Sequence, residues 1–199
     1  MYKRQQVEQA TPQPVAGTGD ADELADKVKV LIPKSAKDVT AGPPKMKYDI
    51  YANKKFGFAT ELPAHWDSEV KDNAQVFSGR KDTEQYNTTV NFQFIIKKEG
   101  RNIRNQADEI LAQWKTMKGF ELDKIKQGDM DGHDALYMVA SYTLPNGEAF
   151  QQMQVIIQRD PYYYMIGYTA PKDLFMKYYF VVVHLLEKFK FTAIEKSAE

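Results

Sequence analysis

The chain has 199 residues, with 27 basic and 27 acidic side chains, no cysteine and 25 aromatic residues (12 Tyr, 11 Phe and 2 Trp). This length can enclose the core of one domain or two. The formal net charge of zero argues against a nucleic-acid binder, which would need an excess of Lys and Arg. The absence of cysteine excludes disulfides and thiolate metal sites. The longest apolar runs, 135–140 and 178–183, are far shorter than the roughly 20 residues of a membrane span.

The first 46 residues differ in composition from the rest of the chain. They contain a single aromatic residue, Tyr2, and five of the nine prolines. A segment without large apolar side chains cannot offset the entropy of ordering its backbone. We therefore expect residues 1–46 to form a flexible tether, with a short helix at 21–32 because Asp20 and Glu23 have the spacing of a capping box. The polar start of the chain lacks the apolar segment of a signal peptide.

From residue 47 to residue 192 the pattern is that of antiparallel strands and two helices, followed by a short tail at 193–199. Asn146-Gly147 and Asp160-Pro161 are typical of tight turns between strands. The expected helices are 105–118, with its apolar residues on one side, and 172–189. The class is α+β, an antiparallel sheet flanked by helices. The expected strands are Tyr48–Ala52, Phe56–Leu62, Ala74–Ser78, Asn87–Lys97, Phe120–Lys126, Ala135–Leu144, Glu148–Arg159 and Tyr162–Thr169.

The order of these motifs resembles the PsbP-like fold. The shared features are the opening hairpin Tyr51–Phe58, Leu62-Pro63-x-x-Trp66, the Gly132–Ala135 entry to a strand, and Tyr168–Pro171 before the last helix. This fold group includes the extrinsic photosystem II protein, DcrB-like bacterial envelope lipoproteins and a nuclear-import factor that binds the Ran GTPase. Eag-type secretion chaperones are also similar. The resemblance implies an α-β-α sandwich that binds proteins or serves as a scaffold, with no catalytic residues and no cofactor to carry over.

A cluster of acidic residues offers the best metal site in the sequence. Asp129, Asp131 and Asp134 could supply carboxylate oxygens to calcium. However, Asp134 and Ala140 stand where an EF-hand loop needs Gly and Glu, and Asp and Gly are also common in turns. We therefore predict a turn and no metal. The three histidines are far apart and form no i,i+4 ligand pair, and no serine lies in a nucleophile elbow.

Two surfaces are candidates for binding. Asn91 and Gln93 face away from the apolar side of their strand, and Gln152, Gln154 and Gln158 share one side of another. Such amides could form a cross-strand ladder, or line a shallow groove with Tyr164 and Tyr168, or simply be a solvated face. The last helix is apolar nearly all round, so either a second element buries Phe180 or Phe180 is exposed for a partner.

These observations lead to three hypotheses. The first is a non-enzymatic, protein-binding PsbP/DcrB-like domain of the bacterial envelope, which would meet the membrane only through a lipid anchor or signal upstream of this sequence. The second is a cytosolic chaperone of the Eag type that holds an apolar helix of an effector. The third is a small-ligand or metal-binding module.

Overall fold

The computed structural model describes residues 46–195, so the expected tether (1–46), its helix (21–32) and the last four residues of the tail lie almost entirely outside it. The helices are α2 (Ile103–Trp114), α3 (Lys172–Lys188) and the short 3-10 helix η3 (Glu84–Asn87). The strands are β1 (Tyr48–Asn53), β2 (Phe58–Pro63), β3 (Asp67–Lys71), β4 (Ala74–Ser78), β5 (Thr89–Ile96), β6 (Glu121–Met130), β7 (His133–Thr143), β8 (Ala149–Arg159), β9 (Tyr162–Pro171) and β10 (Lys190–Phe191).

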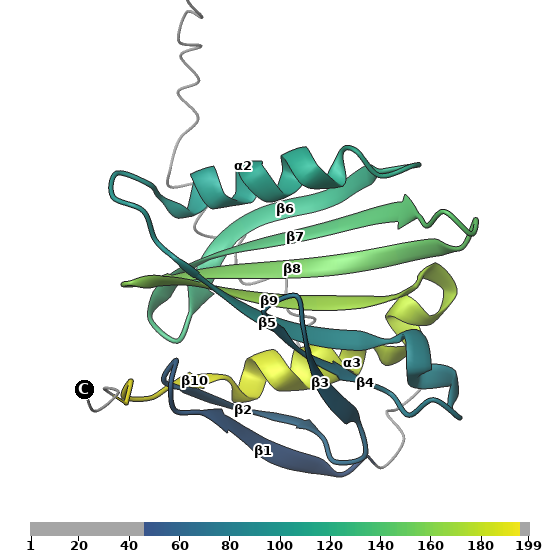
Figure 1. Ribbon diagram of the computed structural model, residues 1–199, viewed down its shortest axis with the longest axis horizontal. Helices are drawn as coiled ribbons and strands as arrows, with labels where there is room; N and C mark the ends of the chain where they lie inside the picture. The colour runs from purple at the N-terminus through teal and green to yellow at the C-terminus, as the bar shows by residue number, and fades with distance from the viewer. Residues whose placement is uncertain (1–45, 196–199) are drawn as a thin grey trace, which may run out of the picture.

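The strands form two antiparallel sheets, one of seven strands in the order β3-β4-β5-β9-β8-β7-β6 and one of three in the order β1-β2-β10 (Figure 1). β3, β4 and β5 are successive neighbours. α2 then connects β5 to β6 at the opposite edge of the large sheet. The chain returns strand by strand until β9 pairs with β5. The connection through α2 therefore has to cross one face of the large sheet.

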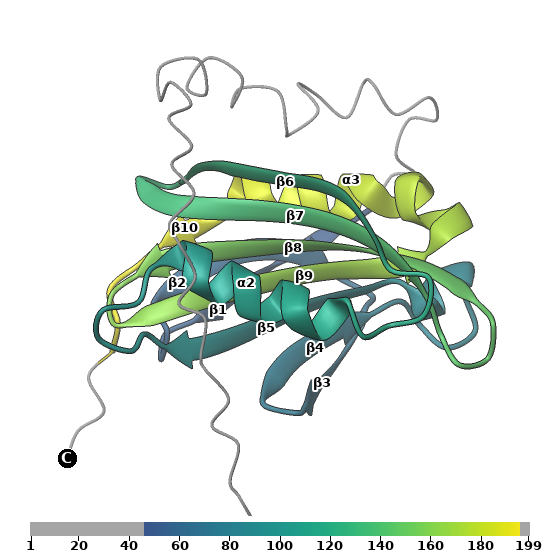
Figure 2. The same ribbon diagram turned by 90° about the horizontal axis from the view of Figure 1, so that it is seen from above.

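The two helices lie on opposite sides of the seven-stranded sheet, which we call the α2 side and the α3 side (Figure 2). Consecutive residues of β9 alternate between them: Tyr163 and Met165 belong to the core under α2, whereas Tyr164 and Ile166 belong to the core under α3. A strand that is covered on both faces has no need of polar residues. This explains why β9 is buried at almost every position.

α2 begins at a well-formed N-cap. Asn102 accepts hydrogen bonds from the backbone N–H groups of Arg104 and Asn105, and the Asn105 side chain accepts one from the backbone of Asn102. The helix ends at Trp114, so the expected range of 105–118 is wrong at both ends. The residues after Trp114 form turns, and the expected left-handed stop, Gly119, has φ +65° but lies beyond the helix.

The three-stranded sheet and α3 together cover the α3 side. Phe58 of β2 packs between Phe92 of β5 and Phe189, with ring centroids 5.3 Å from each. Thr60 donates a hydrogen bond to the carbonyl of Leu185 at 2.6 Å, which ties β2 directly to α3. Phe180 is buried in this core, so the burial alternative is confirmed for the last helix. No helix within residues 46–195 is long and apolar enough to cross a membrane.

The α+β class with helices flanking an antiparallel sheet is confirmed. The first hairpin, however, belongs to a separate sheet that is completed by β10, a strand that the sequence analysis did not predict. β3 was also not expected, and it is exposed along its whole length. A strand with no buried face lacks the alternation by which strands are recognised.

Candidate binding surface

The four predicted amides, Asn91, Gln93, Gln152 and Gln154, all lie on the α2 side of the large sheet. The register pairs Asn91 with Gly167 and Gly167 with Gln154, so these residues share one face. Gln93 pairs with Met165, which packs under α2. The two sets of amides, 61 residues apart in the sequence, therefore form one surface, which we call the amide surface.

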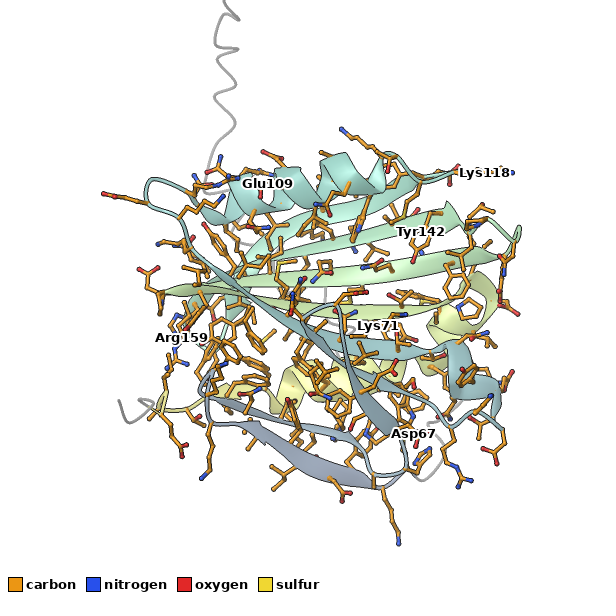
Figure 3. All side chains as sticks on the ribbon, in the orientation of Figure 1. Asp67, Lys71, Glu109, Lys118, Tyr142 and Arg159 are labelled. Atoms are coloured by element: carbon orange, nitrogen blue, oxygen red, sulfur yellow. The ribbon has the colours of Figure 1, made fainter. Side chains whose placement is uncertain are left out.

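The hydrogen bonds within the amide surface are long. Gln152 accepts from the hydroxyl of Tyr142 at 3.4 Å and donates to Gln154 at 3.5 Å, while Gln154 donates to the carbonyl of Val155 at 3.3 Å. Good N–H···O bonds are about 2.9–3.0 Å long. Among the described residues the amides make no hydrogen bond to one another across strands, because Gln152 bonds to Gln154 on the same strand and Gln154 bonds to the adjacent Val155. Gln154 is buried, whereas Asn91, Gln93 and Gln152 are half-buried and can offer donors and acceptors to a ligand. Figure 3 shows Tyr142 near the end of the sheet opposite Arg159.

The expected groove that combines these amides with Tyr164 and Tyr168 is wrong. Both tyrosines lie on the α3 side and are almost completely buried. Their hydroxyls donate to the backbone carbonyls of Phe56 at 2.6 Å and Phe175 at 2.8 Å. Burial raises the pKa of each tyrosine. These two residues and Phe180 therefore belong to the core under α3 and are separated from the amide surface by the sheet.

The acidic cluster is a turn between β6 and β7. Asp131 and Gly132 have positive φ values of 51° and 80°, and the Gly132 N–H donates to Asp129 Oδ1 at 3.0 Å. The Asp131 carboxylate accepts from the Phe191 N–H at 2.8 Å and from Lys190 Nζ at 3.0 Å. These contacts lower the pKa of Asp131, the Phe191 bond most. Asp131 thus links this turn to β10, and Asp134 is exposed.

The histidines remain separate in space. His184 of α3 lies 2.7 Å from Glu61 and stacks on Tyr48, with ring centroids 3.8 Å apart. Burial, and then the Glu61 carboxylate, raise the pKa of Tyr48 to about 12. His133 contacts Phe191, and His65 is exposed. Among the described residues, no three His, Asp or Glu side chains gather closely enough to hold a metal ion.

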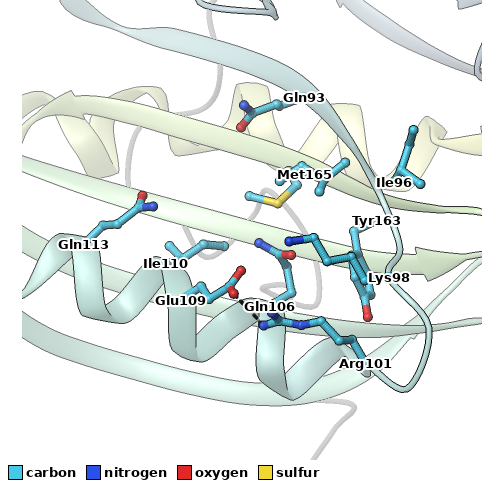
Figure 4. A pocket seen from close by; sticks show the side chains of 11 residues that line it. Gln93, Ile96, Lys98, Arg101, Gln106, Glu109, Ile110, Gln113, Tyr163 and Met165 are labelled. Atoms are coloured by element: carbon cyan, nitrogen blue, oxygen red, sulfur yellow. Dashed lines mark ion pairs between the residues drawn. The ribbon is translucent and has the colours of Figure 1, made fainter.

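Beside the amide surface, α2 and the strands under it enclose a groove of about 230 Å³, which we call the α2 groove (Figure 4). Its walls combine apolar side chains with amides from the sheet and from the helix. The residues that line it are Gln93, Ile95, Ile96, Lys98, Arg101, Gln106, Glu109, Ile110, Gln113, Tyr163 and Met165. Gln93 belongs to both features, so the groove continues the amide surface.

One end of the α2 groove is charged. Arg101 and Glu109 form an ion pair of 2.6 Å across the first turns of α2, drawn as a dashed line in Figure 4. Lys98 is exposed and has no carboxylate within ion-pair distance among the described residues. The hydroxyl of Tyr163 lies at the Arg101 end of the groove, whereas the Lys98 ammonium points toward Gln106 (Figure 4). Because the ion pair is neutral as a unit, the groove carries a net positive charge from Lys98.

No protein-family model and no curated protein matches this sequence. Solved structures do match, among them cyanobacterial PsbP (CyanoP) from Synechocystis sp. PCC 6803, with a TM-score of 0.56 and 9% identity over 76% of this chain and 96% of that chain. LpqN of Mycobacterium tuberculosis, involved in cell envelope biogenesis, matches with a TM-score of 0.53 and 14% identity over 75% and 92%. A protein from Bacteroides thetaiotaomicron VPI-5482 matches with 0.53 and 13% over 77% and 51%.

The chain has a PsbP-like fold. The expectation from the order of motifs is thereby confirmed for the fold.

Sequence reasoning missed the α2 groove, although one signal was available. Gln106 lies on the buried stripe of α2 between Ile103 and Ile110, and it is only 6% exposed. A polar residue inside an apolar helical stripe usually indicates a polar partner or site. Lys98, Arg101 and Tyr163 gave no such signal because they line one groove only when α2 packs against the large sheet.

Proposed function

We propose that this chain is a non-catalytic domain that binds a protein partner in the bacterial cell envelope, outside the cytoplasm. The observation that carries the proposal is the amide surface with the adjoining α2 groove. A primary amide offers two N–H donors and one carbonyl acceptor without net charge, which matches the donors and acceptors of a polypeptide backbone. The partner is therefore held by hydrogen bonds to its main chain and by apolar contacts inside the groove.

The state of these side chains in the free protein supports binding. Long hydrogen bonds contribute little to stability, so breaking them costs little free energy when a partner forms shorter hydrogen bonds with the same side chains. Gln152 and Gln154 project from neighbouring positions of β8 on the same face, and Asn91 and Gln93 do so from β5. Amides spaced along two strands can contact successive residues of an extended segment.

The proposed location is supported by the fold shared with LpqN, which is involved in cell envelope biogenesis in its own organism. Fractionation of the native host, with a tag at the C-terminus of the natural gene product, tests this part. We expect the tagged protein in the envelope or periplasmic fraction. Recovery in the cytosol alone would contradict the proposed location and leave the binding surface to be tested separately.

Photo-crosslinking in cells of the native host tests the surface. A photoreactive amino acid replaces Ile96, an exposed residue that lines the α2 groove, or Ile50 of β1, which is similarly exposed (69% and 78%) and belongs to the other sheet. We expect a defined crosslinked partner from position 96 and none from position 50. The same partner should lose its crosslink when Gln93 and Gln152, the half-buried amides, are both replaced by Leu. Crosslinks from position 50 alone would refute the assignment of the surface.

A further inference from the structure

Within the part of the chain that the structure describes, the α3 side of the large sheet is covered less completely than the α2 side. On β7, Leu136, Met138 and Ala140 face α2 and are at most 2% exposed. Tyr137 and Val139 alternate with them, face α3 and are only half-buried. α3 packs chiefly on β2, β8 and β9. The α3-side face of β7 and of its neighbour β6 therefore lies beside this helix rather than under it.

Two lysines of β6 belong to the same face. Lys124 pairs with Val139 and Lys126 pairs with Tyr137, so the four side chains project to one side, and we call them the basic strip. Three of them line a cleft of about 20 Å³ together with Tyr179 of α3. Such a space holds no more than about one water molecule. The basic strip therefore suits the surface of another polypeptide segment better than a small molecule.

The charge of the basic strip is not neutralised by a neighbour. Neither Lys124 nor Lys126 has a carboxylate within ion-pair distance among the described residues. The adjacent Asp123 instead accepts hydrogen bonds from Ser141 at 2.8 Å and from Gln151 at 2.9 Å. Burial, and then the charge of Lys126, lower the pKa of Lys124. Two positive charges on a half-buried apolar face favour an occupant that is both acidic and apolar.

Residues 20–32 of the same chain, which precede the described part, have this composition, and we call them the acidic segment. In the helix expected at 21–32, Leu24, Val28 and Leu31 would share one stripe. The acidic residues lie in the first half of the segment and are Asp20, Asp22, Glu23 and Asp26.

The acidic segment is also tethered on the correct side of the sheet. Residues 33–45 connect it to Met46, which packs against the core under α3. This connection of 13 residues can span up to about 45 Å, more than the width of a small domain, roughly 30 Å. A tether of this length gives an effective concentration on the order of millimolar. The acidic segment therefore has an advantage over any external occupant of the basic strip.

We propose that the acidic segment docks on the basic strip as an amphipathic helix beside α3. Leu24, Val28 and Leu31 cover the half-buried side chains of β7, and Asp20 and Glu23 lie next to the two lysines. Burial of the apolar stripe supplies most of the free energy, and the charges set the direction of the helix. The basic strip and the amide surface are on opposite sides of the sheet, so this proposal does not rest on the proposed function.

Disulfide trapping in the full chain tests the proposal, because the chain has no cysteine of its own. Val139→Cys is combined in turn with Leu24→Cys, Val28→Cys and Leu31→Cys, and two cysteines are joined only when their Cα atoms come within about 7 Å. Under mild oxidation we expect an intramolecular disulfide in at least one of these variants. It is detected as faster migration on a non-reducing gel and as a mass lower by two hydrogens.

Two control pairs make the trapping specific. Val139→Cys with Lys29→Cys places the second thiol on the opposite side of the expected helix, and Val28→Cys with Val70→Cys moves the first to β3, at the other edge of the sheet. Val70 is 76% exposed, so access does not limit this control. We expect little disulfide in either control. Yields equal to those of the test pairs, or disulfide-linked dimers alone, would overturn the proposal.

A charge exchange tests the contact with the lysines. Lys124→Glu with Lys126→Glu should slow trapping about fivefold, because two weak attractions become repulsions. Adding Asp20→Lys and Glu23→Lys should restore the rate. The matched control is the pair Lys71→Glu and Lys81→Glu, which changes the net charge equally at exposed positions outside the basic strip. Equal slowing by the two lysine pairs, or no recovery in the exchanged variant, would refute the charge contact.

Discussion

Gly167 sits where the side chain of Asn91 crosses the neighbouring strand. A Cβ atom on Gly167 would lie 2.6 Å from Nδ2 and 2.8 Å from Oδ1 of Asn91, closer than real Cβ contacts. The backbone of Gly167 needs no positive φ, so close approach alone explains the glycine. The position of Asn91 on the amide surface therefore depends on a residue without a side chain in β9.

We predict that Gly167→Ala displaces the Asn91 side chain and lowers the free energy of unfolding by about 1 kcal/mol, the lower end of the usual effect of overpacking, because the end of a side chain can move aside. Asn91→Ala should remove most of this effect when combined with Gly167→Ala, because the clashing amide is then absent. Urea denaturation of the two single variants and the double variant measures the coupling. Additive losses in the double variant would show that the two residues do not compete for the same space.

Asp131 shows how a carboxylate that suits a metal can serve the fold instead. Its two acceptor bonds reach Lys190 and Phe191, about 60 residues further along the chain. No local pattern in the sequence can reveal a partner at that distance, so only the turn could be predicted from residues 129–134.

We predict that Asp131 contributes stability that depends on pH. Since its pKa is lowered in the folded protein, this contribution is complete above the unfolded value near pH 4 and is lost as the pH falls through the folded value. Asp131→Asn should therefore reduce the free energy of unfolding by about 1 kcal/mol at neutral pH and by progressively less in acid. Asp134→Asn, which changes an exposed carboxylate of the same turn, is the control. A constant deficit at all pH values would refute the electrostatic explanation.

At the scale of elements, strands with two-residue alternation or tight turns were predictable, and each missed strand has its own physical reason. Ala74–Ser78 was predicted with its observed ends, and Asn146-Gly147 does connect two paired strands. β3 was missed because it buries nothing, although Asp72 and Asn73, with φ values of 49° and 63°, form a turn that adjacent Asp and Asn favour. β10 has only two residues, too few for any periodic pattern.

One guanidinium links the end of β8 in the large sheet to the small sheet. Arg159, at the end of β8, donates to the carbonyls of Gly57 at 2.7 Å and Thr192 at 2.8 Å. Its guanidinium also lies 4.6 Å from the ring centre of Phe191. The planar group thus contacts the chain next to both strands at one end of the β2–β10 pairing, and an aromatic ring at the same time, which a lysine cannot do.

We predict that Arg159→Lys loosens β10 from β2. The Thr192 N–H, which donates to the Gly57 carbonyl at 2.8 Å, should exchange with solvent at least tenfold faster, while amides of β8 should be unaffected. Hydrogen exchange followed by NMR measures both. Lys54→Ala, which removes an exposed ion pair with Glu195 in the same region, should leave the Thr192 amide unchanged because such pairs contribute little. Equal effects of the two variants would contradict the role of the guanidinium.

For the whole molecule, the sequence identifies the fold class and the polar faces of strands, but not which faces meet. Asn91 and Gln154 are each predicted to be polar-facing, yet their common surface follows only from the pairing of β5, β9 and β8. For the same reason Tyr164 and Tyr168 were assigned to the wrong side. The α2 groove forms only where α2 packs on the sheet. It could therefore not be predicted from the pattern of the separate strands.

The central claim is that recognition takes place on the α2 side, and NMR titration of the ¹⁵N-labelled chain with the partner crosslinked at position 96 tests it most directly. The account predicts that the side-chain amide resonances of Asn91, Gln93, Gln152 and Gln154 shift on binding, together with backbone amides of α2. Resonances of β1 and of the exposed face of α3 around Met176 should stay in place. Shifts confined to β1 and α3, with the four amides unmoved, would contradict the account.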